Sequence, residues 1–214
     1  MTSDALLLAL SRPPAGNEGA FNEWYDDEHA PARLTVPGFL TARRYRDVEA
    51  NRGYLAFYDV ESMSVFDDPA YRKLQQEASP RERDMLASAW FDRRVYERLP
   101  TPPEANADDL TVCGEFLQCV WWAPPEDGVD DFNAWYTEEH LPMLMKVPGW
   151  LRARRFRIAD GGGPAFVAIH DLETDDVFSH PAHDASLNTP WRDRVVQVRQ
   201  AYDRRLYRLW RRFD

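Results

Sequence analysis

The sequence predicts an α+β protein that contains two tandem copies of one βαββαβ unit. The stretch FNEWYDDEHAPARLTVPGFLTARRYR begins at Phe21, and its near copy FNAWYTEEHLPMLMKVPGWLRARRFR begins 111 residues later, at Phe132. The same offset recurs downstream, where DRRVYERL at Asp92 matches DRRLYRLW at Asp203. Within each copy, alternating patterns typical of strands flank patterns typical of helices. A period this long indicates a repeated domain rather than one unit of a solenoid.

The first strand of each copy is a short apolar run, ALLLALS in the first and GEFLQCVWW in the second. The first helix follows, and we expect it to end near Pro31 or Pro142, because the residue before a proline resists the α conformation. Val-Pro-Gly then marks a turn, and FLTARRYR or WLRARRFR alternates as a second strand. GYLAFYDVE or PAFVAIHDLE is the third strand, the segment after Pro69 or Pro181 the second helix, and ASAWFDRRVYERL or QAYDRRLYRLW the last strand.

Domain boundaries follow from the repeat and from one segment without periodicity. The segment PTPPEANADDL, residues 100–110, is rich in proline and polar, as linkers are. We therefore expect a first repeat over residues 1–100, a linker over 101–110 and a second repeat over 111–214. One such unit leaves a face of its sheet apolar and uncovered, so the two units are expected to pack sheet to sheet.

The motif Trp-Tyr-x-x-Glu-His-x-Pro, followed after five residues by Pro-Gly and an arginine-bearing strand, occurs in both copies. It resembles the dimeric α+β barrel superfamily, and within it the EthD-like and muconolactone-isomerase-like proteins. The resemblance implies two ferredoxin-like units on one chain, arranged as a pseudo-dimer, with a ligand pocket between sheet and helices. The superfamily includes cofactor-free monooxygenases, isomerases, cyclases, dehydratases and haem enzymes, so the fold alone does not select a reaction.

Composition excludes some partners. The formal charge of −10 and the pI near 5.0 disfavour nucleic acid and anionic membrane surfaces. The longest early apolar run, ALLLAL, is far shorter than the ~20 residues of a membrane span and has no basic residue before it, so we expect a cytoplasmic protein. Cys113 and Cys119 are too far apart on an extended strand for a disulfide and are expected to be free thiols. The chain is expected to be a monomer or a homodimer.

Each first helix carries a glutamate whose role has two interpretations. Winding at 100° per residue places Glu28, and Glu139 in the second copy, on the side of the helix that faces the core. A buried carboxylate needs a partner or a proton. It either forms an ion pair with the repeated arginine, Arg44 or Arg155, or acts as a general acid or base with a raised pKa.

A polar edge lies beside the apolar stripe of the same helix. It consists of Asn22, Tyr25 and His29, and the second copy repeats it with Asn133, Tyr136 and His140. In such an edge an imidazole can take a proton from a carbon or hydroxyl acid near neutral pH, while the phenol hydrogen-bonds an enolate. The alternative is that the histidine only ties the end of the helix to a backbone carbonyl.

Differences between the copies favour the second half as the working half. It has four histidines, whereas the first half has only His29, and His170 replaces Tyr58 on the third strand. His170, His180 and His183 match no standard metal-ligand spacing, so we expect no metal. Haem bound through His140 or His183 remains an alternative. No Gly-rich phosphate loop, nucleophile elbow or dinucleotide motif occurs, and we expect no cofactor.

The sequence therefore predicts a cofactor-independent lyase, isomerase or cyclase that acts on a small aromatic or polyketide-like carbonyl compound. His140 is the expected base, assisted by Tyr136 and Glu139, with His29, Tyr25 and Glu28 as their equivalents. The expected substrate-binding residues are Asn22, Trp24, Arg44 and Tyr58, and in the second half Asn133, Trp135, Arg155 and His170. The rival hypotheses are a non-catalytic ligand-binding or interaction protein, and a haem-dependent or cofactor-free monooxygenase.

Overall fold

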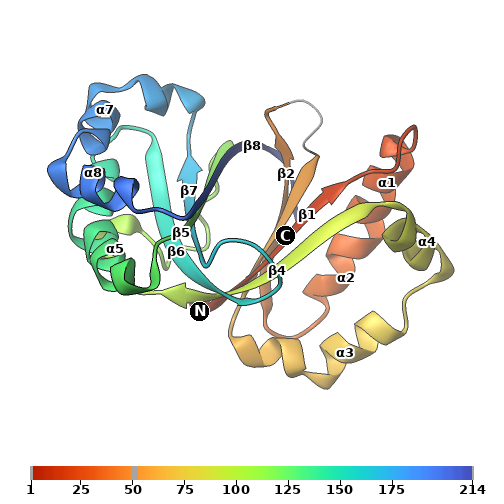
Figure 1. Cartoon of the computed structure of the whole chain (residues 1–214). Helices are drawn as coiled ribbons and strands as arrows, with labels where there is room; N and C mark the ends of the chain where they lie inside the picture. Colours follow the sequence, from red (N-terminus) through yellow and green to blue (C-terminus); the bar gives the residue numbers. More distant parts are fainter. Residues whose placement is uncertain (1, 50–52, 214) are drawn as a thin grey trace. The chain divides into compact units, whose positions relative to one another are not determined.

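Contacts divide the chain into two compact units. The computed structural model describes residues 2–49 and 53–213 (Figure 1). Unit 1 consists of Met1–Glu97, Ala159–Gly162 and Arg208–Asp214, and unit 2 of Arg98–Ile158 and Gly163–Tyr207. The ends of two strands from the second half of the sequence therefore belong to unit 1. Among the described residues, no helix has the length and apolar character that crossing a membrane requires.

Unit 1 has the predicted order of elements. The strands are β1 (Ala5–Arg12), β2 (Phe39–Asp47), β3 (Tyr54–Val60) and β4 (Trp90–Leu99). They are joined in the order β2-β3-β1-β4, with antiparallel pairing throughout. The helices are α1 (Glu18–Trp24), the π-helical turn η1 (Tyr25–His29), α2 (Ala30–Leu34), the 3₁₀ turn η2 (Met63–Asp67), α3 (Pro69–Gln76) and α4 (Pro80–Ser88).

Unit 2 repeats this order, and the α+β class is confirmed. Its strands are β5 (Phe116–Ala123), β6 (Trp150–Asp160), β7 (Phe166–Leu172) and β8 (Ala201–Phe213), joined in the order β6-β7-β5-β8. Its helices are α5 (Val129–Trp135), η5 (Tyr136–His140), α6 (Leu141–Leu144), η6 (Asp175–Ser179), α7 (Pro181–Leu187) and α8 (Pro190–Gln197). Short 3₁₀ turns, η3 (Pro103–Ala105) and η4 (Glu126–Gly128), precede β5 and α5. The predicted sheet-to-sheet packing of the two halves stays a prediction.

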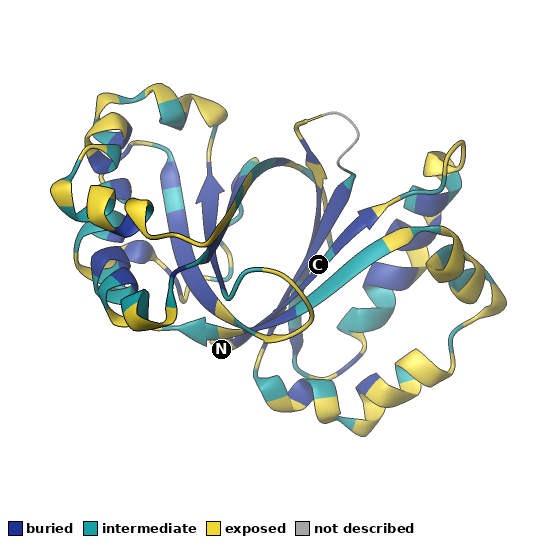
Figure 2. Cartoon of the chain, in the orientation of Figure 1, coloured by how far each residue is buried: buried dark blue, intermediate teal, exposed yellow. Residues whose placement is uncertain are grey.

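Alternation along the strands places one apolar row against the helices of each unit. In β1, Ala5 and Leu7 join the core that contains Phe21 and Trp24 of α1. Figure 2 shows β1 and β3 buried along most of their length, whereas the helices are exposed on their outer sides. The Val-Pro-Gly turns form as predicted, with Gly38 at φ +93°, and a Cβ there would lie 2.4 Å from Val65 Cγ2.

A π-helical turn in the first helix of each unit corrects the predicted helical faces. In η1 the N–H of Ala30 donates to the carbonyl of Tyr25, five residues earlier. The wider turn shifts the following residues around the axis, so that Asp26 and His29 become buried and Glu28 becomes exposed. The prediction that Glu28 faces the core is therefore wrong, because it assumed uniform α-helical winding.

The same turn explains why the helix does not end at its proline. Proline has no N–H to donate, and its ring clashes with the carbonyl four residues earlier in a regular α-helix. The π-helical turn directly precedes Pro31, and α2 continues through this residue to Leu34. Unit 2 does the same, with η5 followed by α6 through Pro142 to Leu144. The predicted helix ends at Pro31 and Pro142 are thus wrong.

Arg44 on β2 pairs with Asp26 rather than with Glu28. Its Nη1 donates to the Asp26 carboxylate, and its Nη2 donates to Asn22 Oδ1 at 2.9 Å. The second Asp26 oxygen accepts from Trp210 Nε1, at the end of β8, at 2.9 Å. Asp26 therefore ties the first helix to two strands of unit 1. Glu28 instead forms a surface ion pair with Arg81 on α4.

Unit 2 lacks this ion pair because Thr137 occupies the position of Asp26. Arg155 donates to Asn133 Oδ1 at 2.8 Å, and its guanidinium lies 4.2 Å from the centroid of the Tyr136 ring. Burial lowers the pKa of Arg155 to about 10. This pKa still leaves the guanidinium charged at neutral pH, stabilised by an amide and an aromatic face.

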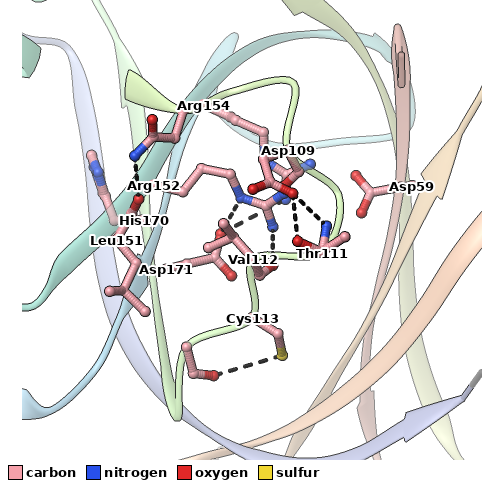
Figure 3. Close-up of polar contacts among 12 residues, drawn as sticks. Asp59, Asp109, Thr111, Val112, Cys113, Leu151, Arg152, Arg154, His170 and Asp171 are labelled. Carbon is pink, nitrogen blue, oxygen red and sulfur yellow. Dashed lines mark hydrogen bonds and ion pairs between the residues drawn. The ribbon is translucent and has the colours of Figure 1, made fainter. Parts of the chain in front are cut away.

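The predicted linker packs against unit 2. Ala105 is fully buried, and Asn106 Nδ2 donates to the Leu151 carbonyl at 3.0 Å. Arg152 on β6 anchors the following residues, because its Nη1 donates to the Asp109 carbonyl and its Nη2 to the Val112 carbonyl at 2.9 Å (Figure 3). The segment is thus an ordered part of the second unit.

Candidate functional site

Unit 1 contains a cavity of about 350 Å³ between its sheet and its helices. This volume lies near the lower end of the ~300–1,000 Å³ that is usual for small-molecule sites. The strands contribute Leu7, Ala9, Tyr58, Phe91 and Arg93 to its wall. The helical segments contribute Tyr25, His29, Arg33, Tyr71, Gln75, Glu82 and Leu86, and the loop between α3 and α4 contributes Ala78. The wall of the cavity therefore combines apolar side chains with a small group of titratable ones.

His29, Glu82 and Arg33 form a polar triad at this cavity. His29 Nδ1 lies 3.0 Å from Glu82 Oε1 on α4 and 3.1 Å from Arg33 Nη1 on α2. The same Arg33 nitrogen also donates to the carbonyl of His29 at 3.0 Å and to Glu82 Oε1 at 3.4 Å. Arg33 therefore has two oxygen acceptors in addition to the imidazole.

These contacts favour one tautomer of His29. A guanidinium has only donors and Arg33 already has oxygen acceptors, whereas the Glu82 carboxylate can only accept. We therefore place the proton of the neutral imidazole on Nδ1, donating to Glu82, which leaves the lone pair on Nε2. This arrangement, a carboxylate that orients an imidazole, is the one that general bases use.

The electrostatics of the triad keep the imidazole neutral. Burial, followed by the nearby Arg33 charge, lowers the pKa of His29 to about 4. The hydrogen bond from His29 lowers the pKa of Glu82, so this residue is a carboxylate at neutral pH. At pH 7 the triad consists of a neutral base, one anion and one cation.

Two phenols face the triad from neighbouring elements. The Tyr58 hydroxyl on β3 lies 3.4 Å from the Tyr25 hydroxyl on η1. Burial raises the pKa of Tyr25 and raises that of Tyr58 well above its ordinary value. Both groups therefore remain protonated. Tyr58 donates to the Tyr25 hydroxyl, which leaves the Tyr25 O–H free to donate to a bound oxygen atom.

The equivalent pocket in unit 2 is much smaller, about 70 Å³. His140 takes the place of His29, but Leu144 stands where Arg33 does, and Arg192 stands where Glu82 does. Glu82 and Arg192 correspond because each is the third residue after the side-chain N-cap of its helix, Ser79 or Thr189. His140 Nδ1 is buried and has no hydrogen-bond partner among the described residues. The oriented base therefore occurs in unit 1 and not in the half that the sequence favoured.

The structure brings together only some of the predicted site residues. Tyr25, His29 and Tyr58 line the unit 1 cavity, and Trp135, Tyr136, His140 and His170 line the unit 2 pocket. Arg44 donates to Asn22, and Arg155 donates to Asn133, and none of these four residues lines either pocket. Glu139 accepts hydrogen bonds from Trp135 Nε1 at 3.1 Å and Thr189 Oγ1 at 2.6 Å, and Trp24 is fully buried in the core.

Sequence reasoning missed Arg33 and Glu82. Neither residue belongs to the repeated motif, since each differs from its counterpart in the other half. A comparison of the two halves at unmatched positions, rather than at matched ones, would have detected both. The differences at Leu144 and Arg192 are the signal that distinguishes the two pockets.

A metal or haem does not fit the histidine-rich pocket of unit 2. Within residues 2–49 and 53–213, no cluster of three or more His, Cys, Asp or Glu side chains is placed to hold a metal ion. His180 accepts from the Ala182 N–H at 3.1 Å as the cap of α7, outside the pocket lining. The 70 Å³ beside His140 and His183 is far below what a porphyrin requires, since pockets for drug-sized ligands start near ~300 Å³.

The folded chain should lose stability as the pH falls below about 6.5. Burial lowers the pKa of His29 to about 4 and those of His140 and His170 to about 3. The unfolded chain binds these protons first, so the histidine contribution is complete above pH ~6.5 and falls progressively towards pH ~3–4. We expect a loss of about 1 kcal/mol per histidine for each pH unit in this window. Urea denaturation at several pH values measures it, and a flat profile would contradict burial of the neutral imidazoles.

Comparisons with known proteins rest on structure. No protein-family model matches the sequence, and no curated protein matches it either. A candidate monooxygenase of Lactobacillus acidophilus NCFM superposes with a TM-score of 0.60 at 10% identity, covering 99% of this chain and 96% of its own. An anthrone oxidase-like protein gives 0.59 at 12% identity, with 100% and 95% covered.

Chlorite dismutase of Candidatus Nitrospira defluvii is a third structural relative. It superposes with a TM-score of 0.62 at 11% identity, covering 98% of this chain and 92% of its own. At these identities the likeness concerns the fold alone. The chain therefore shares its α+β fold with monooxygenase-like and chlorite dismutase-like proteins of solved structure.

Proposed function

We propose that the chain is an enzyme that removes a proton from a small aromatic carbonyl compound bound in the unit 1 cavity, with His29 as the base. The observation that carries this proposal is the contact of 3.0 Å between His29 Nδ1 and Glu82, in a cavity of about 350 Å³ that also contains two protonated phenols. The proposal moves the reaction from the second half, where the sequence favoured it, to the first half.

The chemistry of the step follows from the protonation states. His29 Nε2 accepts the proton of a carbon acid conjugated to a carbonyl group, and the electron pair of the C–H bond moves to the carbonyl oxygen to form an enolate. The Tyr25 hydroxyl, which accepts a hydrogen bond from Tyr58, can donate to this oxygen. The cation of Arg33 stabilises the negative charge that develops and lowers the basicity of His29 before the reaction.

Two reactions begin with this step. Reprotonation at another carbon, or loss of a leaving group, gives an isomerase or lyase, which the likeness of the Trp-Tyr-x-x-Glu-His-x-Pro motif to EthD-like and muconolactone-isomerase-like proteins supports. Reaction of the enolate with O₂ gives a cofactor-free oxygenase. The candidate monooxygenase and the anthrone oxidase-like protein among the structural relatives support that outcome equally. Proton abstraction is common to both reactions.

Anthrone is a suitable probe, because its methylene group is conjugated with its carbonyl. Incubation in D₂O without oxygen, followed by NMR, measures exchange of the methylene protons, and the proposal predicts exchange faster than in buffer alone. With O₂ present, an oxygenase consumes one O₂ per anthrone and forms anthraquinone and water, whereas an isomerase or lyase shows exchange without consuming O₂. Binding of anthrone in the unit 1 cavity without faster exchange would contradict the proposed base and favour a ligand-binding protein.

A further inference from the structure

The unit 2 pocket has a lining that is unusually basic for an acidic chain. The chain carries a formal charge of −10. Yet the pocket is lined by the guanidinium groups of Arg192 and Arg204 and by three imidazoles, and no Asp or Glu is among its described lining residues. A concave site with charge of one sign attracts ligands of the opposite sign. Its three histidines are His140, His170 and His183.

Hydrogen bonds assign the proton positions of two of these imidazoles. His170 Nδ1 lies 3.2 Å from Trp150 Nε1, which can only donate, so the proton of His170 is on Nε2. His183 Nδ1 lies 3.1 Å from the Phe178 carbonyl, which can only accept, so Nδ1 carries its proton. His170 thus keeps one N–H donor that the Trp150 contact leaves free. His183 can gain a second donor by binding a proton.

His140 has an unused ring nitrogen in the same pocket. Its Nδ1 is buried without a hydrogen-bond partner among the described residues, which is costly for a polar atom. In unit 1 the equivalent nitrogen of His29 lies beside Glu82. Since Arg192 stands where Glu82 does, the described part of unit 2 has no counterpart of the Glu82 carboxylate beside its histidine.

The charged groups around the three histidines also favour a negatively charged ligand. Burial lowers the pKa values of all three histidines; His170 and then Arg192 lower that of His140 further, and Arg204 lowers those of His170 and His183. The backbone carbonyls of Ser186 and Phe178 oppose the shift for His140 and His183. The opposing acidic groups are Asp171 beside His170 and Asp184 beside His183, and neither lines the pocket. The pocket therefore has an excess of positive potential.

We propose that the unit 2 pocket binds a small oxyanion, a carboxylate or a phosphate group, held by Arg192, Arg204 and the Nε2–H of His170, and by Nδ1 of His140 once that nitrogen has bound a proton. The volume of about 70 Å³ restricts the ligand to such a group or to the end of a longer molecule. The bound anion would supply to His140 the negative charge that Glu82 supplies to His29. This site is independent of the chemistry proposed for unit 1.

Titration calorimetry of the full chain with sodium acetate, and separately with sodium phosphate, tests this proposal at constant ionic strength. We expect saturable binding of at least one anion, weakened about tenfold or more in Arg192→Gln, because a charge-assisted hydrogen bond contributes about 1.5–3 kcal/mol. The matched control is Arg194→Gln, which removes the same charge from the same helix at a residue paired with Asp131 outside the pocket. It should bind as the parent does.

A second measurement locates the ligand. The imidazole nitrogen resonances of His140 should shift on addition of the anion, whereas those of His29 should not. The proposal fails if neither anion binds, if Arg194→Gln weakens binding as much as Arg192→Gln, or if the His140 resonances do not move at saturation. Preference for acetate or phosphate distinguishes a carboxylate ligand from a phosphorylated one. The failure of this site leaves the exchange reaction in unit 1 unaffected, since that reaction is measured separately.

Discussion

The His29→Gln protein is expected to exchange substrate protons about 10²–10⁴-fold more slowly than the parent, whereas His140→Gln should exchange at close to the parental rate. Of these two histidines, His29 has the imidazole oriented by a carboxylate and the cavity large enough for a ring compound. Glutamine keeps a polar group of similar length but cannot accept a proton. Anaerobic deuterium exchange of anthrone, followed by NMR, measures both rates.

Stability measurements separate a chemical role from a structural one. Each histidine packs beside an aromatic ring, the buried His29 4.5 Å from Trp24 and the half-buried His140 4.4 Å from Trp135 between ring centroids. Glutamine keeps a donor for Glu82 in His29→Gln, and His140 Nδ1 has no partner to lose among the described residues, so each replacement is expected to change the melting temperature by a similar amount. A difference in exchange rate then reports on chemistry. Equal losses of exchange in both variants, in proportion to their loss of stability, would indicate that His29 only packs.

Replacement of Arg152 by Met should lower the free energy of unfolding by about 3–5 kcal/mol. The Arg152 and Asp171 side chains are fully buried, with Nε and Oδ2 2.8 Å apart. Loss of the guanidinium leaves the buried Asp171 carboxylate without its nearest cation. Arg154 Nη2 lies farther from the same carboxylate oxygen, at 4.0 Å. It also removes the donors to the carbonyls of Asp109 and Val112, which hold the inter-repeat segment against β6. Denaturation in guanidinium chloride measures the change.

A surface pair on the other unit is the control for this prediction. Arg81 forms ion pairs with Glu28 and Glu23 at a partly exposed site, so Arg81→Met should cost less than about 1 kcal/mol. The double variant Arg152→Met with Asp171→Leu should recover part of the loss, because the buried carboxylate is then removed together with its partner. A loss below about 1 kcal/mol for Arg152→Met alone would contradict the assigned role of this network.

The repeated motif allowed the order of the elements to be predicted, because apolar alternation and Val-Pro-Gly turns depend on local sequence. The faces of the first helix could not be predicted in the same way. A single π-helical turn shifts every later residue around the helix axis. Periodicity analysis assumes a constant 100° per residue and therefore cannot predict this shift. Glu28 and Asp26 exchanged roles for this reason.

The sequence predicted some residues of the candidate site and missed others. Tyr25, His29 and Tyr58 were identified because they lie on the predicted helix and strand facing the pocket. Arg33 and Glu82 were missed, since the importance of Glu82 depends on where α4 places its first turn relative to η1. The choice of the second half rested on its number of histidines, and the aromatic side chains that fill its pocket were not predictable from that count.

A crystal structure of the full chain with anthrone, prepared without oxygen, is the most direct test of the central claim that unit 1 holds the reacting compound. The account predicts a single ring compound in the unit 1 cavity, with its oxygen within hydrogen-bonding distance of Tyr25 or Tyr58 and its methylene carbon facing His29 Nε2. Anthrone bound only in the unit 2 pocket, or bound in unit 1 with its methylene carbon turned away from His29, would contradict it.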